Sequence, residues 1–433
     1  MMLESLFPQR ILISVQITVK PVTDPRALSS VLGATMRIAQ RMGIHSESFN
    51  RKHPALEAEL RRRLWWSLIL FDARISEMTD SKLSTLLPTW DCKVPSNTND
   101  FDYRAEMANP PEAHGVTSEA LFVVVRGEFG DFIRHCSFHL DFINPSLNKL
   151  VRSHTARVAN VDELTIFERK IEEEYLQHCD PRNPLHFMTI HWARGQLAKH
   201  RFLKDLSEDS HVIAARTDAQ HDNSVSHALT MIECDTQLMS STLTTGCRWA
   251  IYINFPFPAY VHAVQDLRKR PFSRIAERAW EVMSDNCTAR FMNVDHVDTM
   301  MGRKTNPFFA IFATVVLQAW SVREAALADR GLPAAESIPS IVTLIKTRLV
   351  SAEGEAQNDT NVLQPGLGQF SGDTSMLPGV NGDSTYVSNG DVSAFGDDGL
   401  SLILPQQSMG LEVEAPIWGW PGPNFHPMMG QGW

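Results

Sequence analysis

The chain has 433 residues, and its hydrophobic content of 43% is enough for one large folded domain or two ordinary ones. No apolar run reaches the roughly 18 residues of a membrane span, and the apolar run at 11–19 has no small-residue cleavage site, so neither a span nor a secretory signal is predicted. The net charge of −10 lies entirely in residues 351–433, and the neutral remainder lacks the broad positive surface of a nucleic-acid-binding domain.

A first helix is predicted over residues 24–43. Asp24 is a suitable N-cap, and Pro25 stands at the first helical position, where its missing N–H would be unpaired in any case. Apolar residues then recur every three or four positions, and Gly43 suits the left-handed backbone conformation that ends a helix.

A second helix is predicted over residues 57–77, and the chain is organised around this stretch. Its leucines recur on one face, whereas Trp65 and Trp66 lie about 100° apart on a helix and cannot share a face. More than one neighbour must therefore pack against this helix.

Three consecutive arginines precede the tryptophan pair. Arg61 and Arg63 follow Glu57 and Glu59 by four residues, in the more favourable order for a helical ion pair, which contributes a few tenths of a kcal/mol. Two interpretations of this triplet, which includes Arg62, remain open: a solvated face that happens to be basic, or part of the family signature described below.

A polar segment containing several prolines follows and is predicted to be an extended loop. Its short polar side chains can accept hydrogen bonds from their own backbone amides; they are Asp91, Asn97, Asn99 and Asp100. These oxygens also suggest a cation site, but no convergent set of partners is visible, so no metal ligand is predicted here.

The helical pattern repeats as far as residue 350. Apolar periodicity predicts further helices at 117–140, 162–178, 184–206, 219–241, 249–269, 274–284, 307–328 and 338–350. No stretch sustains a two-residue alternation, so the predicted class is all-α, with one large domain of roughly ten helices over residues 24–350.

Residues 351–433 form a region of different composition. They hold 14 of the 23 glycines and cannot bury enough apolar area to offset the entropy of ordering, so they are predicted to be a disordered tail. Their ten acidic residues stand among aromatic and aliphatic ones, which is typical of activation segments that bind a coactivator. An inert tail is the alternative.

Six cysteines are scattered along the chain, at positions 92, 136, 179, 234, 247 and 287. A zinc cluster needs close pairs of the C-x2-C kind, and no two of these cysteines are that close. We interpret them as reduced, mostly buried thiols of an intracellular protein.

One pair of histidines could support chemistry. His135, His139 and Asp131 share a helix face and could bind a metal or act as a base with an orienting acid, although 16 histidines would give such a pair by chance. His191 and residues 295–298 are weaker candidates of the same kind. No known catalytic or nucleotide-binding motif is present, so we predict no catalytic, cofactor-binding or metal residues and no enzyme activity.

The basic cluster at residues 267–271 has two interpretations. It could be a nuclear import signal, but a helix C-terminus favours cations through its dipole, and this second interpretation is preferred.

Four stretches of the sequence lie at residues 24–28, 37–45, 59–72 and 91–100. In their order and spacing they resemble the regulatory "middle homology" domain of fungal-specific transcription factors, which lies downstream of a binuclear zinc cluster. The resemblance covers residues 11–325 and is strongest at 24–106, and residues 228–271 look like the later part of the domain. The matching signature residues are Asp24, Arg26, Arg37, Gln40, Gly43, His45, Arg61, Arg62, Arg63, Trp65, Trp66, Asp72, Asp91, Pro95, Asn97, Asn99 and Asp100.

The resemblance implies a nuclear transcription regulator that controls a metabolic or secondary-metabolite gene cluster. Residues 1–23 would be a truncated remnant without a zinc cluster, so zinc would be a cofactor only if such a cluster precedes them. Expected partners are a coactivator or a zinc-cluster relative, DNA at the level of the family, and a small-molecule effector, but no membrane. The alternatives are an interaction module that pairs with a full-length relative, and an all-α enzyme or ligand carrier that uses His135 and His139.

Overall fold

The computed structural model describes residues 25–79, 90–104, 106–112, 117–135, 162–209, 217–291, 307–331, 337–347 and 349. Across these ranges the regular structure is helical and contains no strand, which confirms the predicted all-α class. The predictions for the remnant at 1–23 and the tail at 351–433 concern residues outside these ranges.

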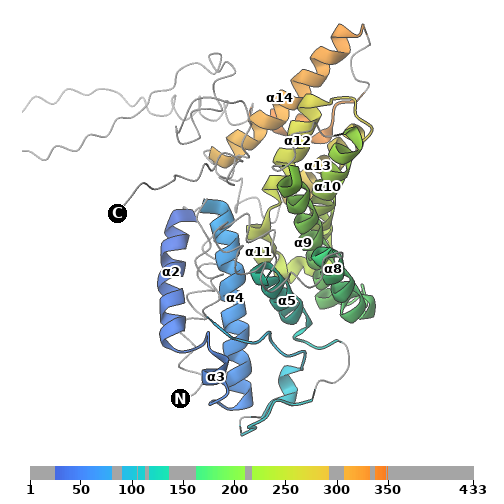
Figure 1. The fold of residues 1–433 in the computed structure, drawn as a ribbon. Helices are drawn as coiled ribbons and strands as arrows, with labels where there is room; N and C mark the ends of the chain where they lie inside the picture. The colour runs from blue at the N-terminus through green and yellow to red at the C-terminus, as the bar shows by residue number, and fades with distance from the viewer. Residues whose placement is uncertain are drawn as a thin grey trace, which may run out of the picture.

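Helices follow one another along the described chain (Figure 1), and short 3-10 turns lie between some of them. They are α2 (Pro25–Arg41), α3 (Glu47–Asn50), α4 (Ala55–Thr79), α5 (Leu121–His135), α8 (Glu163–Glu174), α9 (Pro184–Asp209), α10 (Asp218–Ser240), α11 (Arg248–Ile251), α12 (Phe257–Lys269), α13 (Ala276–Phe291) and α14 (Pro307–Asp329). Residues 340–347 are also helical.

The helices form two groups that meet at α5. In the first, which we call the N-terminal bundle, α2 and α4 pack side by side with α3 and the extended segment 90–104 (Figure 1). In the second, the C-terminal bundle, α10 packs against α9, α12 and α13, and α14 covers α12. Helix α5 contacts α4 on one side and α9 on the other, so it joins the two bundles.

Each bundle has its own apolar core. The core of the N-terminal bundle lies between α2, α4 and the start of the extended segment, with Trp65, Trp66 and Leu68 almost inaccessible to solvent. The C-terminal core is larger and lies between α9, α10, α12, α13 and α14, around Tyr260 and Trp280. One face of each helix is buried in a core, so its apolar residues recur every three or four positions. Sequence periodicity therefore identified the buried faces of the helices.

Helix α2 ends as predicted. Gly43 has a φ of 70°, in the left-handed region. Its amide donates to Gln40 O at 3.0 Å, and the Ile44 amide donates to Ala39 O at 3.2 Å, which is the Schellman arrangement of a helix C-terminus. A Cβ at Gly43 would lie 2.6 Å from the Phe49 ring, so both backbone and space require glycine here.

The prediction of a single helix at 249–269 is wrong. The chain forms the short helix α11, then a 3-10 turn at Tyr252–Asn254, and only then α12 from Phe257. The helix is interrupted at Pro256. Proline has no N–H to donate to the preceding turn, and its ring clashes with a continuous helix. At the break, the carbonyls of Ile253 and Phe255 accept hydrogen bonds from the side chain of Arg74 on α4.

Candidate functional site

The arginine triplet of α4 joins separate segments of the chain. Arg61 Nε donates to Glu57 Oε1 at 2.9 Å, and its Nη1 donates to Met42 O, just beyond α2, at 3.1 Å. Arg62 makes two hydrogen bonds to the Glu47 carboxylate on α3, at 3.1 and 2.7 Å. These contacts decide against a solvated basic face, since Arg61 and Glu47 are both buried.

The third arginine of the triplet reaches the extended segment. Arg63 Nε donates to Glu59 Oε1 at 3.0 Å, and its Nη1 donates to Asp100 Oδ1 at 2.6 Å. The buried Glu59 carboxylate also accepts the Ser96 backbone N–H at 3.1 Å. Both predicted i,i+4 pairs are therefore formed, but as members of a larger network.

Glu47 is the centre of this network, and sequence reasoning did not find it. Besides Arg62, its carboxylate accepts from the Lys93 amide at 3.3 Å and from Arg51 at 3.4 Å. Its own amide donates to Asp91 at 2.8 Å. Burial alone would raise the pKa of Glu47, but the hydrogen bond and charge of Arg62 outweigh burial and hold the pKa below its usual value. No helical spacing relates Glu47 to Arg62, so only the folded chain reveals the pair.

More than one neighbour packs against the helix at the two tryptophans, as predicted. Trp65 and Trp66 both contact the Trp90 ring edge-on, with centroid distances of 5.4 and 5.2 Å. Trp66 Nε1 donates to Lys93 O at 2.7 Å. On the side of α5, a Cβ at Gly130 would lie 2.8 Å from the Trp66 ring, so this glycine allows α5 to approach α4 closely.

The polar side chains of the extended segment accept hydrogen bonds from other elements of the chain, which the sequence analysis did not predict. Asn97 Oδ1 accepts from the Ser118 hydroxyl at 2.6 Å, and Asn99 Oδ1 accepts from the Glu119 amide at 3.1 Å, both just before α5. Asp91 and Asp100 of this segment bind α3 and α4, as given above. The segment therefore connects α3, α4 and α5.

Other signature residues also lie against this network. The His45 ring packs on Trp65 with a centroid distance of 5.7 Å. Pro95 is buried, and its Cδ lies 3.0 Å from where a Cβ at Gly127 of α5 would be. The signature thus describes the contacts that hold the N-terminal bundle together.

Five signature positions are not placed in the network. Arg37 and Gln40 are exposed on α2, and Asp72 is half-buried on α4. Asp24 lies outside the described residues, as does the side chain of Arg26.

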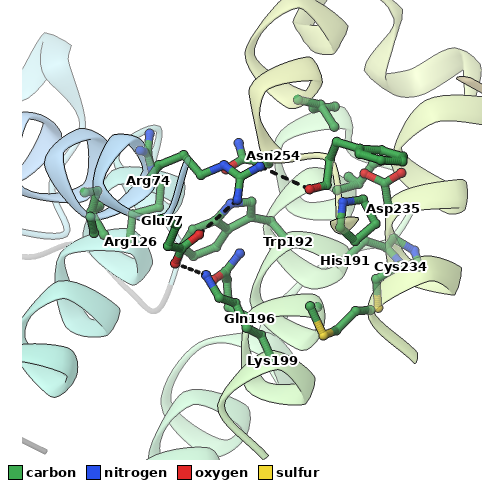
Figure 2. A pocket seen from close by; sticks show the side chains of 18 of the residues that line it. Arg74, Glu77, Arg126, His191, Trp192, Gln196, Lys199, Cys234, Asp235 and Asn254 are labelled. Carbon is green, nitrogen blue, oxygen red and sulfur yellow. Dashed lines mark hydrogen bonds and ion pairs between the residues drawn. The ribbon is translucent and has the colours of Figure 1, made fainter. Parts of the chain in front are cut away.

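A cavity of about 110 Å³ lies where the two bundles meet (Figure 2). It is lined by α4, α5, α9, α10 and the broken stretch at 251–258. Its polar and aromatic lining includes Arg74, Glu77, Arg126, His191, Trp192, Gln196, Lys199, Cys234, Asp235 and Asn254. The sequence analysis identified only His191 among these side chains as a candidate, because the lining comes from five segments far apart in the chain.

An ion-pair clasp closes one side of the cavity. Arg74 Nη1 donates to Glu77 at 2.9 Å, and Lys199 of α9 binds the other oxygen of the same carboxylate (Figure 2). Arg74 also donates to Ile253 O at 2.7 Å and to Phe255 O at 3.1 Å. Burial alone would raise the pKa of Glu77, but attraction to Lys199 and Arg74 outweighs it and lowers the pKa. The clasp ties α4 to the C-terminal bundle.

A second buried network forms the opposite wall. Arg290 Nε of α13 donates to Asp235 Oδ2 at 2.6 Å, and Asn286 Nδ2 donates to the same oxygen at 2.7 Å. The Tyr260 hydroxyl donates to Asn286 Oδ1 at 2.8 Å. The charge of Asp235 is therefore matched inside the C-terminal bundle and is not directed at a ligand.

The metal and acid–base candidates gain no support from the described residues. The His139 and 295–298 candidates lie outside them, as does the side chain of His135. Burial and the nearby charge of Arg194 lower the pKa of His191. Within the described ranges, no three His, Cys, Asp or Glu side chains are grouped as metal ligands would be.

No described helix is both long and apolar enough to cross a membrane.

The basic cluster at 267–271 ends α12. Arg270 pairs with Asp266 at 2.7 Å and with Asp222 at 2.9 Å, which fits the structural interpretation rather than a free import signal.

Of the cysteines in the described part of the chain, Cys92, Cys234 and Cys287 are buried free thiols, whereas Cys247 is exposed. Burial raises the pKa of Cys234 to about 12.

Comparison with known proteins identifies the class. Residues 10–115 match the sequence profile described as the fungal specific transcription factor domain, so the chain carries that domain, as its signature indicated. No solved structure gives a significant match.

Three fungal proteins are among the relatives similar to this chain. Transcriptional regulator AacuB of Aspergillus aculeatus is 51% identical over 71% of this chain and 41% of its own length. Transcriptional regulator nsrM of Aspergillus novofumigatus is 40% identical over 95% of this chain and 52% of its own. The aurofusarin cluster transcription factor aurR2 of Gibberella zeae is 27% identical over 82% of this chain and 51% of its own. The chain thus spans about half the length of these relatives.

Proposed function

We propose that this chain is a transcription regulator of the fungal zinc-cluster type that controls the genes of a secondary-metabolite biosynthetic cluster. The observation that carries the proposal is the fungal specific transcription factor domain at 10–115 in a chain whose relatives are named as transcriptional regulators. Two of the relatives are named for biosynthetic clusters, of aurofusarin and of pyriculol and pyriculariol. The chain acts in the nucleus and not as an enzyme.

The two-bundle architecture supports a regulatory mechanism. The bundles are joined by α5 and by the clasp of Arg74, Glu77 and Lys199, rather than by one common core. A partner or small molecule that binds one packing of the bundles better than another shifts the population toward it. We propose that this shift controls the exposure of residues 351–433 to a coactivator, and that DNA is reached through a zinc cluster of this chain or of a relative.

A reporter assay tests the proposal. The whole chain, and the chain without residues 351–433, are fused to a heterologous DNA-binding domain, and reporter transcription is measured. We expect activation by the whole chain and its loss on deletion of the tail. No activation by the whole chain would remove the activator function, and co-purification with a zinc-cluster relative in that case would favour the interaction module instead. A fluorescent fusion tests the nuclear location.

A further inference from the structure

Arg126 is a half-buried cation, and it has no counter-charge among the described residues. It lies in the second turn of α5 and lines the cavity between the bundles. Its Nε is buried without a hydrogen-bond partner, and no carboxylate of the described chain pairs with its guanidinium. Its neighbours are the Phe122 and Trp192 rings, whose centroids lie 5.5 and 5.7 Å from Cζ. Burial lowers the pKa of Arg126 to about 10.

This environment differs from that of the other arginine in the cavity. Arg74 has a carboxylate and two backbone carbonyls as partners. Within the described part of the chain, Arg126 contacts ring faces instead, which stabilise a cation by about 0.5–2 kcal/mol. Removing an unpaired charge from water costs several kcal/mol. A bound anion would supply the missing partner.

The charge of the cavity also favours an anion. Its lining carries three cations, Arg74, Arg126 and Lys199. Arg74 and Lys199 share the single Glu77 carboxylate, so two positive charges are in excess. The remaining carboxylate is Asp235, and it is paired with an arginine outside the lining.

The size and the apolar part of the lining restrict the anion further. The volume of about 110 Å³ is smaller than the roughly 150 Å³ of an engineered cavity that holds benzene, so the ligand is a small molecule. Apolar side chains complete the wall; they are Leu70, Ile133, Trp192, Met231, Leu238 and Ile251. A short carbon chain fits these side chains better than a fully hydrated inorganic ion does.

We propose that this cavity binds a short-chain organic carboxylate, whose carboxylate group pairs with the Arg126 guanidinium and whose carbon chain packs against the Trp192 ring. Because α4 and α5 line one side of the cavity and α9, α10 and residues 251–258 the other, the bound molecule contacts both bundles. Its use as a regulatory signal rests on the proposed function, but its binding does not.

Binding is tested on the purified full chain with sodium butyrate as the probe, by calorimetry and by tryptophan fluorescence. Methyl butyrate is the neutral control, and inorganic phosphate is the control for an unspecific anion. We expect saturable butyrate binding in the millimolar range or tighter, at least ten times weaker binding of methyl butyrate and phosphate, and a loss of at least tenfold in Arg126→Met. Arg126→Lys keeps the charge without the planar fork and should retain part of the affinity.

Arg268→Met, which replaces an arginine of α12 outside the cavity lining, is the matched control and should bind like the parent. Equal binding of butyrate and phosphate, unchanged affinity in Arg126→Met, or no saturable binding by the parent would each overturn the proposal. These results are independent of the reporter assay, so a failed binding site and a failed activator function can be told apart.

Discussion

The N-terminal bundle and the cavity use arginine in opposite ways. In the bundle, Arg61, Arg62 and Arg63 each bind a carboxylate, and each also reaches, directly or through that carboxylate, a second segment of the chain. In the cavity, Arg126 is enclosed by aromatic rings and has no such partner within the described residues. Buried charges that are fully paired hold segments in register, whereas a buried charge left without a partner is retained at a cost and marks a candidate binding position.

The largest effect is expected from removing the carboxylate at the centre of the network. Glu47→Ala leaves Arg62 and the Lys93 amide without their acceptor, so the free energy of unfolding should fall by about 3–5 kcal/mol. Urea denaturation measures this change. Glu172→Ala breaks an ion pair with Arg194 that is about half exposed, and it should cost at most about 1 kcal/mol. Equal losses in the two variants would show that the network is ordinary surface charge.

A second prediction concerns acid stability at the junction of the bundles. His200 on α9 is buried against Phe129 and Phe132, and burial lowers its pKa to about 4. The unfolded chain takes up a proton at His200 near the usual histidine pKa, whereas the folded chain does so only near pH 4. The contribution of His200 to the free energy of unfolding is therefore fully present above about pH 6.5, and it falls by about 3 kcal/mol as the pH drops toward 4.

His200→Phe should remove this part of the pH dependence. Unfolding free energies of parent and variant are measured from pH 7 to 4. The slope of the unfolding free energy against pH is then compared between the two proteins, rather than its absolute value. The other histidines with lowered pKa values, His53, His191 and His227, remain in both proteins and cancel in the difference. Parallel curves would contradict the burial of a neutral imidazole at position 200.

A smaller effect is expected at the contact between α4 and α5. Gly130→Ala places a Cβ 2.8 Å from the Trp66 ring and should destabilise the protein by about 1–3 kcal/mol, because neither helix can move freely. Gly33→Ala is the matched control, since a Cβ there meets nothing within 4 Å and the residue lies in the interior of α2. It should stabilise the protein by about 0.5–1 kcal/mol. Thermal unfolding distinguishes the opposite signs.

The sequence predicted what local periodicity controls and missed what distant contacts decide. Apolar spacing gave α2, α4, α9 and α10 nearly to their ends, and Gly43 gave the end of α2, because burial and backbone conformation act within a few residues. The same reasoning treated residues 249–269 as one helix, since it gave the apolar pattern more weight than Pro256.

Long-range pairs could not be predicted in the same way. Arg62 and Glu47 are 15 residues apart, and Arg74 reaches carbonyls 179 and 181 residues away, at no spacing that a helix or strand would produce. The signature at residues 59–66 did indicate that the triplet matters. It did not indicate that its role is to join α2, α3 and the extended segment, nor did it point to Arg126.

The stability of two matched variants tests the contrast between paired and unpaired arginines most directly. Arg62→Met and Arg126→Met replace a partly buried guanidinium with an apolar side chain of similar length, and their unfolding free energies are measured without added carboxylate. Arg62→Met leaves Glu47 buried without its main partner and should lose about 3–5 kcal/mol. Arg126→Met removes a charge that has no carboxylate partner among the described residues, and it should lose nothing or gain stability. Equal losses in the two variants would contradict the account.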